Sequence, residues 1–240
     1  MGIENLTKPA RKLLKLQHCG AVIVAAGNAS RMGGIDKVMA QLGGEPMILR
    51  TVRTFNECDA IKEIVVVTRP DLIIPISHLC AGLTKVKAVI AGGATRQESV
   101  EMGLHGLSDK VKLAAIQDGA RPLVTWQVID RVVRAANTYR AAAPAIPVKD
   151  TIKVVTGGIV KETPDRSSLQ AVQTPQVFDI DLLRGALKKA KEDGAAITDD
   201  CSAVERLGMK VRIVEGDERN LKITTPMDLK IAELLLEEEL

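Results

Sequence analysis

The sequence predicts a protein of the α/β class, with a mostly parallel β-sheet flanked by helices and a projecting β-hairpin arm. Short β-rich apolar runs alternate with segments whose apolar residues recur at helical spacing, which is the pattern of a parallel sheet covered by helices. The length of 240 residues, with 46% hydrophobic and 26% charged content, is enough for one large core. We therefore expect a single domain over residues 1–240, of which 1–18 form an amino-terminal extension.

Six apolar runs are expected to form the strands of the main sheet. They lie at residues 21–26, 64–68, 86–90, 113–117, 141–148 and 211–214. Three segments between them place apolar side chains on one helical face, namely Ile48, Val52 and Phe55; Ile129, Val132, Val133 and Ala136; and Leu183, Ala186, Leu187 and Ala190. Each of these faces should pack on the sheet.

One stretch breaks this alternation. Residues 148–155 and 159–163 have the pattern of two extended pieces, and Thr156, Gly157 and Gly158 between them are a hairpin signal. We expect an arm at about 148–166 that projects from the sheet.

Charge, cysteine usage and hydropathy exclude several classes of protein. The formal net charge is only +3, too little for the dense phosphate contacts of a dedicated nucleic-acid binder. The four cysteines, Cys19, Cys58, Cys80 and Cys201, form no CxxC pair, so neither a zinc cluster nor a disulfide framework is indicated. No apolar stretch approaches the roughly 20 residues of a membrane-spanning helix, and residues 1–17 do not resemble a signal peptide. We expect a cytoplasmic protein without nucleic-acid or membrane partners.

The first predicted strand runs into a loop that suits a triphosphate, at the end of the strand where ligands bind in open α/β sheets. Ala25, Ala26 and Gly27 are small enough for backbone N–H groups to approach phosphate oxygens, and Arg31 and Lys37 add positive charge. A plain strand-to-loop turn with surface cations is the alternative. The loop has neither GxGxxG nor the GxxxxGK order of a P-loop, which argues against a dehydrogenase and a P-loop NTPase.

A second candidate loop follows the third predicted strand. Two glycines at 92–93 end the strand, and Thr95 with Glu98 forms a capping-box pattern that opens a helix. The exposed N–H groups and Ser99 could hold a nucleotide base. A well-capped helix after a glycine turn explains Thr95 and Glu98 equally well, and that interpretation does not need Arg96.

The fourth predicted strand ends in the sequence QDGARP at 117–122. Asp118 suits Mg²⁺, which usually takes one or two carboxylates together with substrate phosphates. The alternative is an Asp-Gly turn with a local ion pair between Asp118 and Arg121.

Further polar residues downstream could grip a phosphorylated polyol. They are Asp150 and Thr151 in the arm, Arg166 at its end, Thr174 in QTPQ, and Thr198 in ITDD. Taken singly, Thr198 has the pattern of a helix N-cap and Thr174 that of a chain bend before proline. Lys222 lies shortly before a helix that Thr225, Pro226 and Asp228 should cap, and the residues alone leave its role open.

Read in order, these motifs resemble the 2-C-methyl-D-erythritol 4-phosphate cytidylyltransferase family of the non-mevalonate isoprenoid pathway. The resemblance runs from Ala21 to about Leu236. Its most telling stretches are AAGNASRMGG with Lys37, AGGATRQESV, QDGARP, PVKDTIK, the run from Arg166 through QTPQVF, ITDD and NLKITTPMDL. It implies a Rossmann-like fold of the nucleotide-diphospho-sugar transferase type.

The resemblance also implies the site. Arg31, Lys37 and Lys222 would be catalytic cations on CTP, and Asp118 would help to hold Mg²⁺ or another divalent cation. The nucleotide would be lined by Ala25, Ala26, Gly27, Gly93, Ser99 and Ala120. Contacts to methylerythritol phosphate would come from Asp118, Arg121, Thr151, Arg166, Thr174 and Thr198. A homodimer through the hairpin arm is implied, in which Thr151 and Arg166 reach the neighbouring subunit's site.

The implied reaction is in-line attack by a substrate phosphate oxygen on the α-phosphorus of CTP, with release of pyrophosphate. Two other functions stay open at this point. The nearer one is a ribitol-5-phosphate cytidylyltransferase, against which Ala120 before Arg121 and the segment 149–151 argue. The other is a non-catalytic nucleotide-binding protein, which should have lost cations such as Lys37 or the carboxylate of Asp118.

Overall fold

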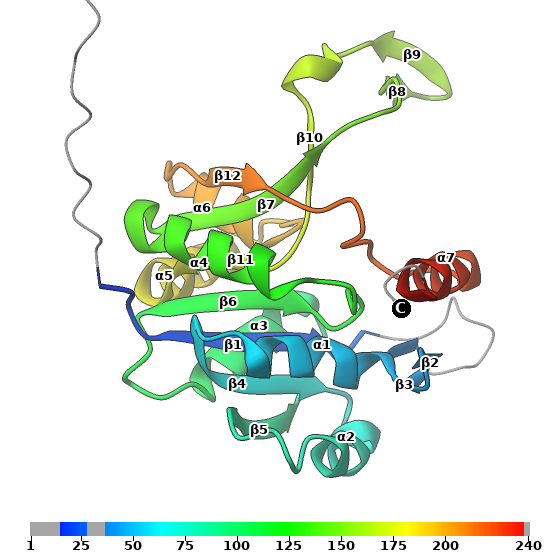
Figure 1. The fold of residues 1–240 in the computed structure, drawn as a ribbon. Coiled ribbons are helices and arrows are strands. Elements are labelled where there is room, and N and C mark those ends of the chain that lie inside the picture. Colours follow the sequence, from blue (N-terminus) through cyan, green and yellow to red (C-terminus); the bar gives the residue numbers. More distant parts are fainter. Residues whose placement is uncertain (1–14, 28–36, 238–240) are drawn as a thin grey trace, which may run out of the picture.

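The structure is a computed structural model that describes residues 15–27 and 37–237 (Figure 1). The main sheet contains β1 (Cys19–Ala25), β4 (Ile61–Thr68), β5 (Val86–Ala91), β6 (Leu113–Asp118), β7 (Ala141–Pro147), β10 (Gln170–Val172), β11 (Gln176–Asp179) and β12 (Arg212–Glu215). The strand order is β10-β7-β11-β6-β1-β4-β5, with β12 paired to β7. The β1, β4, β5 and β6 core and the β7 to β12 pair are parallel, whereas β10 and β11 run antiparallel to their neighbours. The mostly parallel sheet is therefore confirmed.

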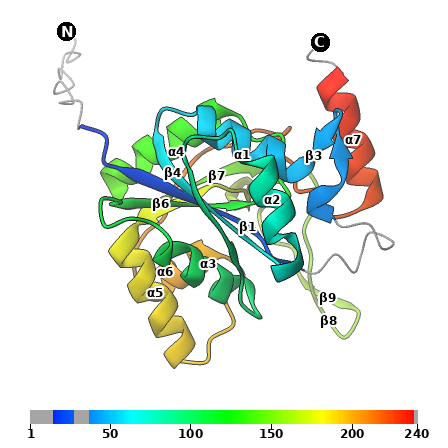
Figure 2. The same cartoon turned by 90° about the horizontal axis from the view of Figure 1, so that it is seen from below.

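Helices cover both faces of the sheet (Figure 2). One face carries α1 (Met47–Glu57), α2 (Ile73–Leu79) and α4 (Trp126–Tyr139), and the other carries α3 (Arg96–His105), α5 (Ile180–Glu192) and α6 (Asp200–Arg206). The last helix, α7 (Pro226–Glu237), lies beside the short hairpin of β2 (Gln41–Leu42) and β3 (Glu45–Pro46). Single 3-10 turns lie at η1 (Lys37–Met39), η2 (Pro70–Leu72) and η3 (Arg166–Ser168).

Each face of the sheet has its own apolar core. Ile48, Val52 and Phe55 of α1 join Ile129 and Val132 of α4 in the first core, all of them fully buried. The second core gathers the apolar side chains of α3, α5 and α6. The three predicted helical faces therefore pack on the sheet, as their 3.6-residue period requires.

The predicted arm is present, with a shorter paired region than the sequence suggested. It consists of β8 (Val154–Thr156) and β9 (Ile159–Glu162), and every residue from 149 to 163 is exposed (Figure 1). The first extended piece was expected to begin at residue 148, but residues 148–153 form no strand, so this part of the prediction is wrong. Thr156 pairs with Ile159, so the turn is Gly157 and Gly158 alone, at φ of 58° and 78° that favour glycine.

Two local expectations are corrected. The predicted strand at 21–26 begins two residues earlier, at Cys19, and Ala26 lies beyond its end. The N-cap of α6 is Asp199 and not Thr198, because the Asp199 carboxylate accepts the Ser202 N–H at 2.9 Å.

The strands β10 and β11 were missed at the sequence level. They are only three and four residues long, and in β11 the two apolar residues, Val177 and Phe178, are adjacent, so no apolar alternation marks it.

No helix among residues 15–27 and 37–237 is long and apolar enough to cross a membrane. Within the same ranges the four cysteines are buried and carry free thiols. Of the expected extension at 1–18, residues 1–14 lie outside the described part of the chain, while Gln17 donates its N–H to Asn137 Oδ1 at 3.0 Å.

Candidate active site

The candidate site is a cavity of about 480 Å³ at the carboxyl ends of β1, β4, β5 and β6. Its walls come from residues 24–27, 68–70 and 92–96, from η1 and from Lys222. Parallel strands present their carboxyl ends at one edge, so four separate loops meet there. The edge chosen from the sequence is the edge at which the cavity lies.

Nine of the residues expected in the site line this cavity. They are Ala25, Ala26, Gly27, Lys37, Gly93, Ser99, Asp118, Ala120 and Lys222. Arg31, the remaining expected catalytic cation, lies outside the described residues. The loops after β1, β5 and β6 thus meet around one space.

The other expected residues among those described do not line the cavity, and they lie in three places. Arg121 and Thr174 touch Asp118, since the Arg121 Nε lies 3.7 Å from Asp118 Oδ2 and the Asp118 N–H donates to Thr174 Oγ1 at 3.1 Å. Thr151 and Arg166 lie in the exposed arm, where Arg166 donates to the Lys149 carbonyl at 2.6 Å. Thr198 immediately precedes the cap of α6.

The glycines at 92–93 allow the loop after β5 to pack closely on its neighbours. A Cβ on Gly92 would lie 2.5 Å from Ala26 Cβ and 2.7 Å from Ser99 Oγ, so the position has no room for a side chain. The predicted capping box is confirmed, because Thr95 Oγ1 accepts the Glu98 N–H at 3.1 Å and the Glu98 carboxylate accepts the Thr95 N–H at 3.3 Å. The loop is therefore a capped helix start that also forms a wall of the cavity, and its contact with a nucleotide base stays a prediction.

Asp118, the last residue of β6, is buried and surrounded by cations. Lys222 Nζ lies 2.8 Å from its Oδ2, Arg96 Nε lies 3.6 Å from its Oδ1, and Arg121 flanks Oδ2. Burial alone would raise the pKa of this carboxyl, but Lys222 and then Arg96 outweigh burial and hold the pKa below its ordinary value. Asp118 is therefore a carboxylate at any pH near neutrality.

The segment before α7 carries Lys222 into place. Arg121 Nη1 donates to the Asn220 carbonyl at 2.6 Å, and Asn220 Nδ2 donates to the Thr174 carbonyl at 2.9 Å. The Ile223 N–H donates to the Ala120 carbonyl at 2.9 Å. These bonds fix residues on both sides of Lys222, so its ammonium is held at the tip of β6.

Arg96 and Asp200 were missed as site residues. Arg96 is the first residue of α3 and donates from Nη2 to Asp200 Oδ2 at 2.8 Å. One sequence signal could have found Arg96: it is a cation at a helix N-terminus, where the helix dipole disfavours positive charge. Such a residue needs an acidic partner from elsewhere in the fold.

Comparisons with known proteins agree on one family. A family model described as 2-C-methyl-D-erythritol 4-phosphate cytidylyltransferase matches residues 19–238. The enzyme of that name from Symbiobacterium thermophilum is 46% identical over 220 residues, covering 91% of this chain and 92% of that protein. Its namesake from Geobacillus kaustophilus is 46% identical over 219 residues, covering 90% of this chain and 96% of that protein.

Solved structures give the same answer. The crystal structure of 2-C-methyl-D-erythritol 4-phosphate cytidylyltransferase from Thermus thermophilus matches with a TM-score of 0.78 and 34% identity, covering 92% of this chain and 100% of that one. The 4-diphosphocytidyl-2C-methyl-D-erythritol synthase of Anaerococcus prevotii matches with a TM-score of 0.84 and 28% identity, over 92% and 96% of the two chains.

Proposed function

Because the chain belongs to the 2-C-methyl-D-erythritol 4-phosphate cytidylyltransferase family, we propose that its cavity binds CTP and that the residues around Asp118 meet methylerythritol phosphate. The chain is a nucleotidyltransferase that transfers the cytidylyl group from CTP to 2-C-methyl-D-erythritol 4-phosphate. The products are pyrophosphate and 4-diphosphocytidyl-2-C-methyl-D-erythritol. The relatives and structures named above all carry this activity or its product in their names. Ribitol 5-phosphate is therefore included only as an alternative substrate in the assay.

One observation carries the assignment of residues: Lys37, Lys222 and the small residues after β1 and β5 line one cavity, with a buried carboxylate beside them. The substrate phosphate is already a nucleophile near neutral pH, so the protein has to align it and to offset negative charge. Lys37 and Lys222 would stabilise the charge that grows on the CTP phosphates, and Arg31 is proposed for the same role from the sequence. Backbone N–H groups near Gly27 and Gly93 would hold the nucleotide.

Asp118 fits a divalent cation. Among the described residues that line the cavity it is the one carboxylate, and a single carboxylate with substrate phosphates is a usual set of Mg²⁺ ligands. Residues 15–27 and 37–237 contain no group of three His, Cys, Asp or Glu that would hold a metal without substrate. We propose Mg²⁺ or another divalent cation, which when bound would neutralise phosphate charge.

The polyol half of the site is proposed to use Arg121, Thr174 and Thr198 from one subunit. Thr151 and Arg166 lie in the exposed arm and would serve the neighbouring subunit of a homodimer. The arm supports this because its apolar side chains face solvent, with Ile159 73% exposed. We further propose a single domain over residues 1–240 that acts in the cytoplasm, a reducing compartment that suits its free thiols.

The assay that tests this function measures pyrophosphate release with CTP, UTP and ATP, each crossed with methylerythritol phosphate and ribitol 5-phosphate. We expect activity with CTP and methylerythritol phosphate, and loss of it when a chelator removes divalent cations. Reactions without the polyol phosphate control for hydrolysis of CTP. Activity restricted to ribitol phosphate would overturn the substrate assignment. Full activity in excess chelator would overturn the proposal that a divalent cation is required.

A further inference from the structure

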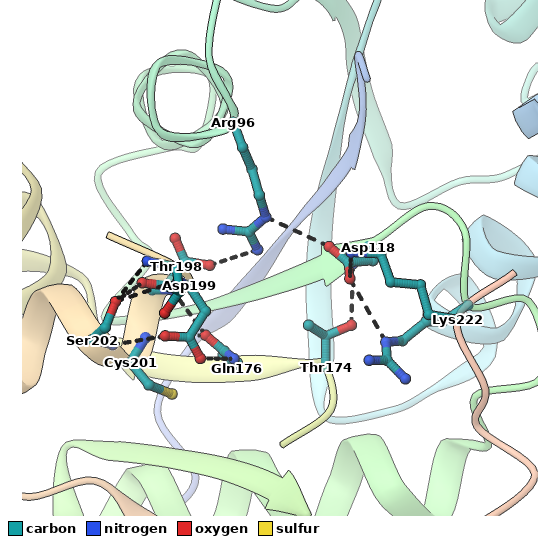
Figure 3. A network of polar contacts seen from close by, with 11 residues as sticks. Arg96, Asp118, Thr174, Gln176, Thr198, Asp199, Cys201, Ser202 and Lys222 are labelled. Carbon is teal, nitrogen blue, oxygen red and sulfur yellow. Dashed lines mark hydrogen bonds and ion pairs between the residues drawn. The ribbon is translucent and has the colours of Figure 1, made fainter. Parts of the chain in front are cut away.

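The guanidinium of Arg96 lies between two carboxylates from different parts of the fold (Figure 3). Its Nη2 is 2.8 Å from Asp200 Oδ2 and its Nε is 3.6 Å from Asp118 Oδ1. The Asp200 side chain is 0% exposed and that of Asp118 is 11% exposed. Two buried acids from β6 and α6 thus share one cation from α3.

Asp200 depends on this contact. Among the described residues, Arg96 is the cation that pairs with Asp200. The other carboxylate oxygen of Asp200, Oδ1, is buried without a hydrogen-bond partner. A buried carboxylate that loses its cation is strongly destabilised. The position of Arg96 is therefore set by Asp200, in spite of the helix dipole of α3.

Asp200 begins α6, two residues after Thr198. The backbone of this turn is tied to β11, because Gln176 Oε1 accepts the N–H groups of Asp200 and Cys201, each at 3.1 Å. The Arg96 contact adds a tie to α3 and to the tip of β6. Figure 3 shows Arg96 between Asp118 on one side and Thr198 with Asp199 on the other.

The loop that forms the nucleotide wall does not need this guanidinium. Glu98 accepts the Ala94 N–H at 2.8 Å, and the Ser99 hydroxyl donates to the Thr95 carbonyl at 2.9 Å. These bonds hold the turn before α3 whatever side chain stands at position 96. Loss of the guanidinium should therefore affect the two halves of the site unequally.

We propose that Arg96 is a positioning residue for cytidylyl transfer, which bridges Asp118 and Asp200 and so fixes the polyol half of the site, at Thr198, against the tip of β6. This rests on the proposed function, because it takes Thr198 as a contact to methylerythritol phosphate. The bridge needs a guanidinium, whose planar fork presents two separate donor edges, whereas an ammonium is a single point charge.

The test compares Arg96→Lys, Arg96→Gln and Asp200→Asn in the full chain. Displacement of reacting groups by about 1 Å can cost about 100-fold, so we expect kcat/KM for methylerythritol phosphate to fall by about 100-fold in both Arg96 variants, with KM for that substrate raised. The Kd for CTP alone, measured by calorimetry, should change by a smaller factor than this, because Arg96 lies in the cavity wall but Glu98 and Ser99 keep the backbone of that wall in place. The Asp200→Asn change removes the buried charge while keeping the shape, so it should fold and shift the same KM.

Arg134→Gln is the matched control, since it breaks an Arg–Asp pair of 2.6 Å between Arg134 and Asp130, both on α4, and should leave all constants unchanged. If Arg96→Lys kept the wild-type kcat/KM and KM for methylerythritol phosphate, the proposed bridge would be wrong, because a positive charge alone would then suffice. An equal loss of CTP affinity would also overturn it, because Arg96 would then serve the nucleotide half. A wild-type protein that makes no cytidylyl product rejects the proposed function instead, so the two failures are distinguishable.

Discussion

At the scale of single residues, the tip of β6 holds more positive than negative charge. Arg96, Arg121 and Lys222 all lie beside the single carboxylate of Asp118, and Arg96 also pairs with Asp200. Burial of Arg121 lowers the pKa of its guanidinium, against the opposing effect of Asp118, and the group stays charged at neutral pH. A site of this kind attracts a triphosphate and is prepared for charge that grows during the reaction.

Removing one of the cations in the cavity should lower turnover without unfolding the protein. We expect Lys37→Ala and Lys222→Ala each to reduce kcat by about 100-fold to 1,000-fold, because each removes a charge that stabilises the transition state. Steady-state kinetics with methylerythritol phosphate measures the effect, and thermal unfolding checks the fold. The same loss is expected for Arg31→Ala.

Lys62→Ala is the matched control, because Lys62 is exposed on β4 and donates to the Asp59 carbonyl, outside the cavity. It removes the same charge and should leave kcat unchanged. Near-normal turnover in Lys37→Ala or Lys222→Ala would exclude that lysine from the chemistry.

At the scale of elements, α3 packs unusually closely on the sheet. Gly103 lies near the C-terminal end of α3, and a Cβ there would overlap Val22 Cγ1 of β1 and lie 2.9 Å from Val67 Cγ2 of β4. Both contacts are to short, branched side chains in the core, which have little freedom to move away. This close approach holds the C-terminal part of α3 against β1 and β4.

Two glycine-to-alanine changes in helices should have opposite effects on stability. Gly103→Ala should lower the free energy of unfolding by about 1–3 kcal/mol, through overpacking of the core. Gly185→Ala in α5, where a new Cβ meets nothing within 4 Å, should raise it by about 0.5–1 kcal/mol through helix propensity. Urea unfolding of both variants measures the difference, and a stabilised Gly103→Ala would show that α3 does not pack as described.

At the scale of the whole molecule, the arm is the feature that a single subunit leaves unexplained. Val154, Val155, Ile159 and Val160 are between 43% and 73% exposed, on a hairpin that projects from the sheet. Thr151 and Arg166 lie at its two ends and do not line the cavity of their own subunit. Both facts are accounted for if a second copy packs against the arm and receives these residues.

Mixing two inactive variants tests this arrangement. In a heterodimer of Arg166→Ala with Lys37→Ala, one site has a normal Lys37 from one subunit and a normal Arg166 from the other. Co-expression with random pairing should therefore restore about a quarter of the wild-type activity, because half of the dimers have one intact site of two. Activity no higher than that of either variant alone would place the arm over its own subunit's site.

Ile159→Lys extends this test, since a charge on the arm should separate the subunits and lower activity. Ile74→Lys on α2 is the matched control, because Ile74 is 68% exposed and lies away from the arm. Analytical ultracentrifugation gives the oligomeric state of each variant. A monomeric wild-type protein would contradict the homodimer itself.

Sequence patterns predict six strands of the main sheet, its three main packing helices, the arm and the edge at which the cavity lies. These follow from local signals: apolar periods of 2 and 3.6 residues, the glycine pair of the hairpin turn, and the capping pattern of Thr95 with Glu98. The sequence also predicts the loops whose small residues and cations form the cavity, because each loop is a continuous motif. The family, once confirmed, fixed the reaction.

The pairs of charges in the site depend on the folding of the whole chain. Arg96 and Asp200 are 104 positions apart, and Asp118 reaches Lys222 across a similar gap, so no spacing in the chain reveals these pairs. The antiparallel strand β11 was hidden for the same reason, since its stability comes from pairing with β6 and β7 and not from its own pattern. Long-range contacts depend on strand order, and strand order is a property of the folded chain.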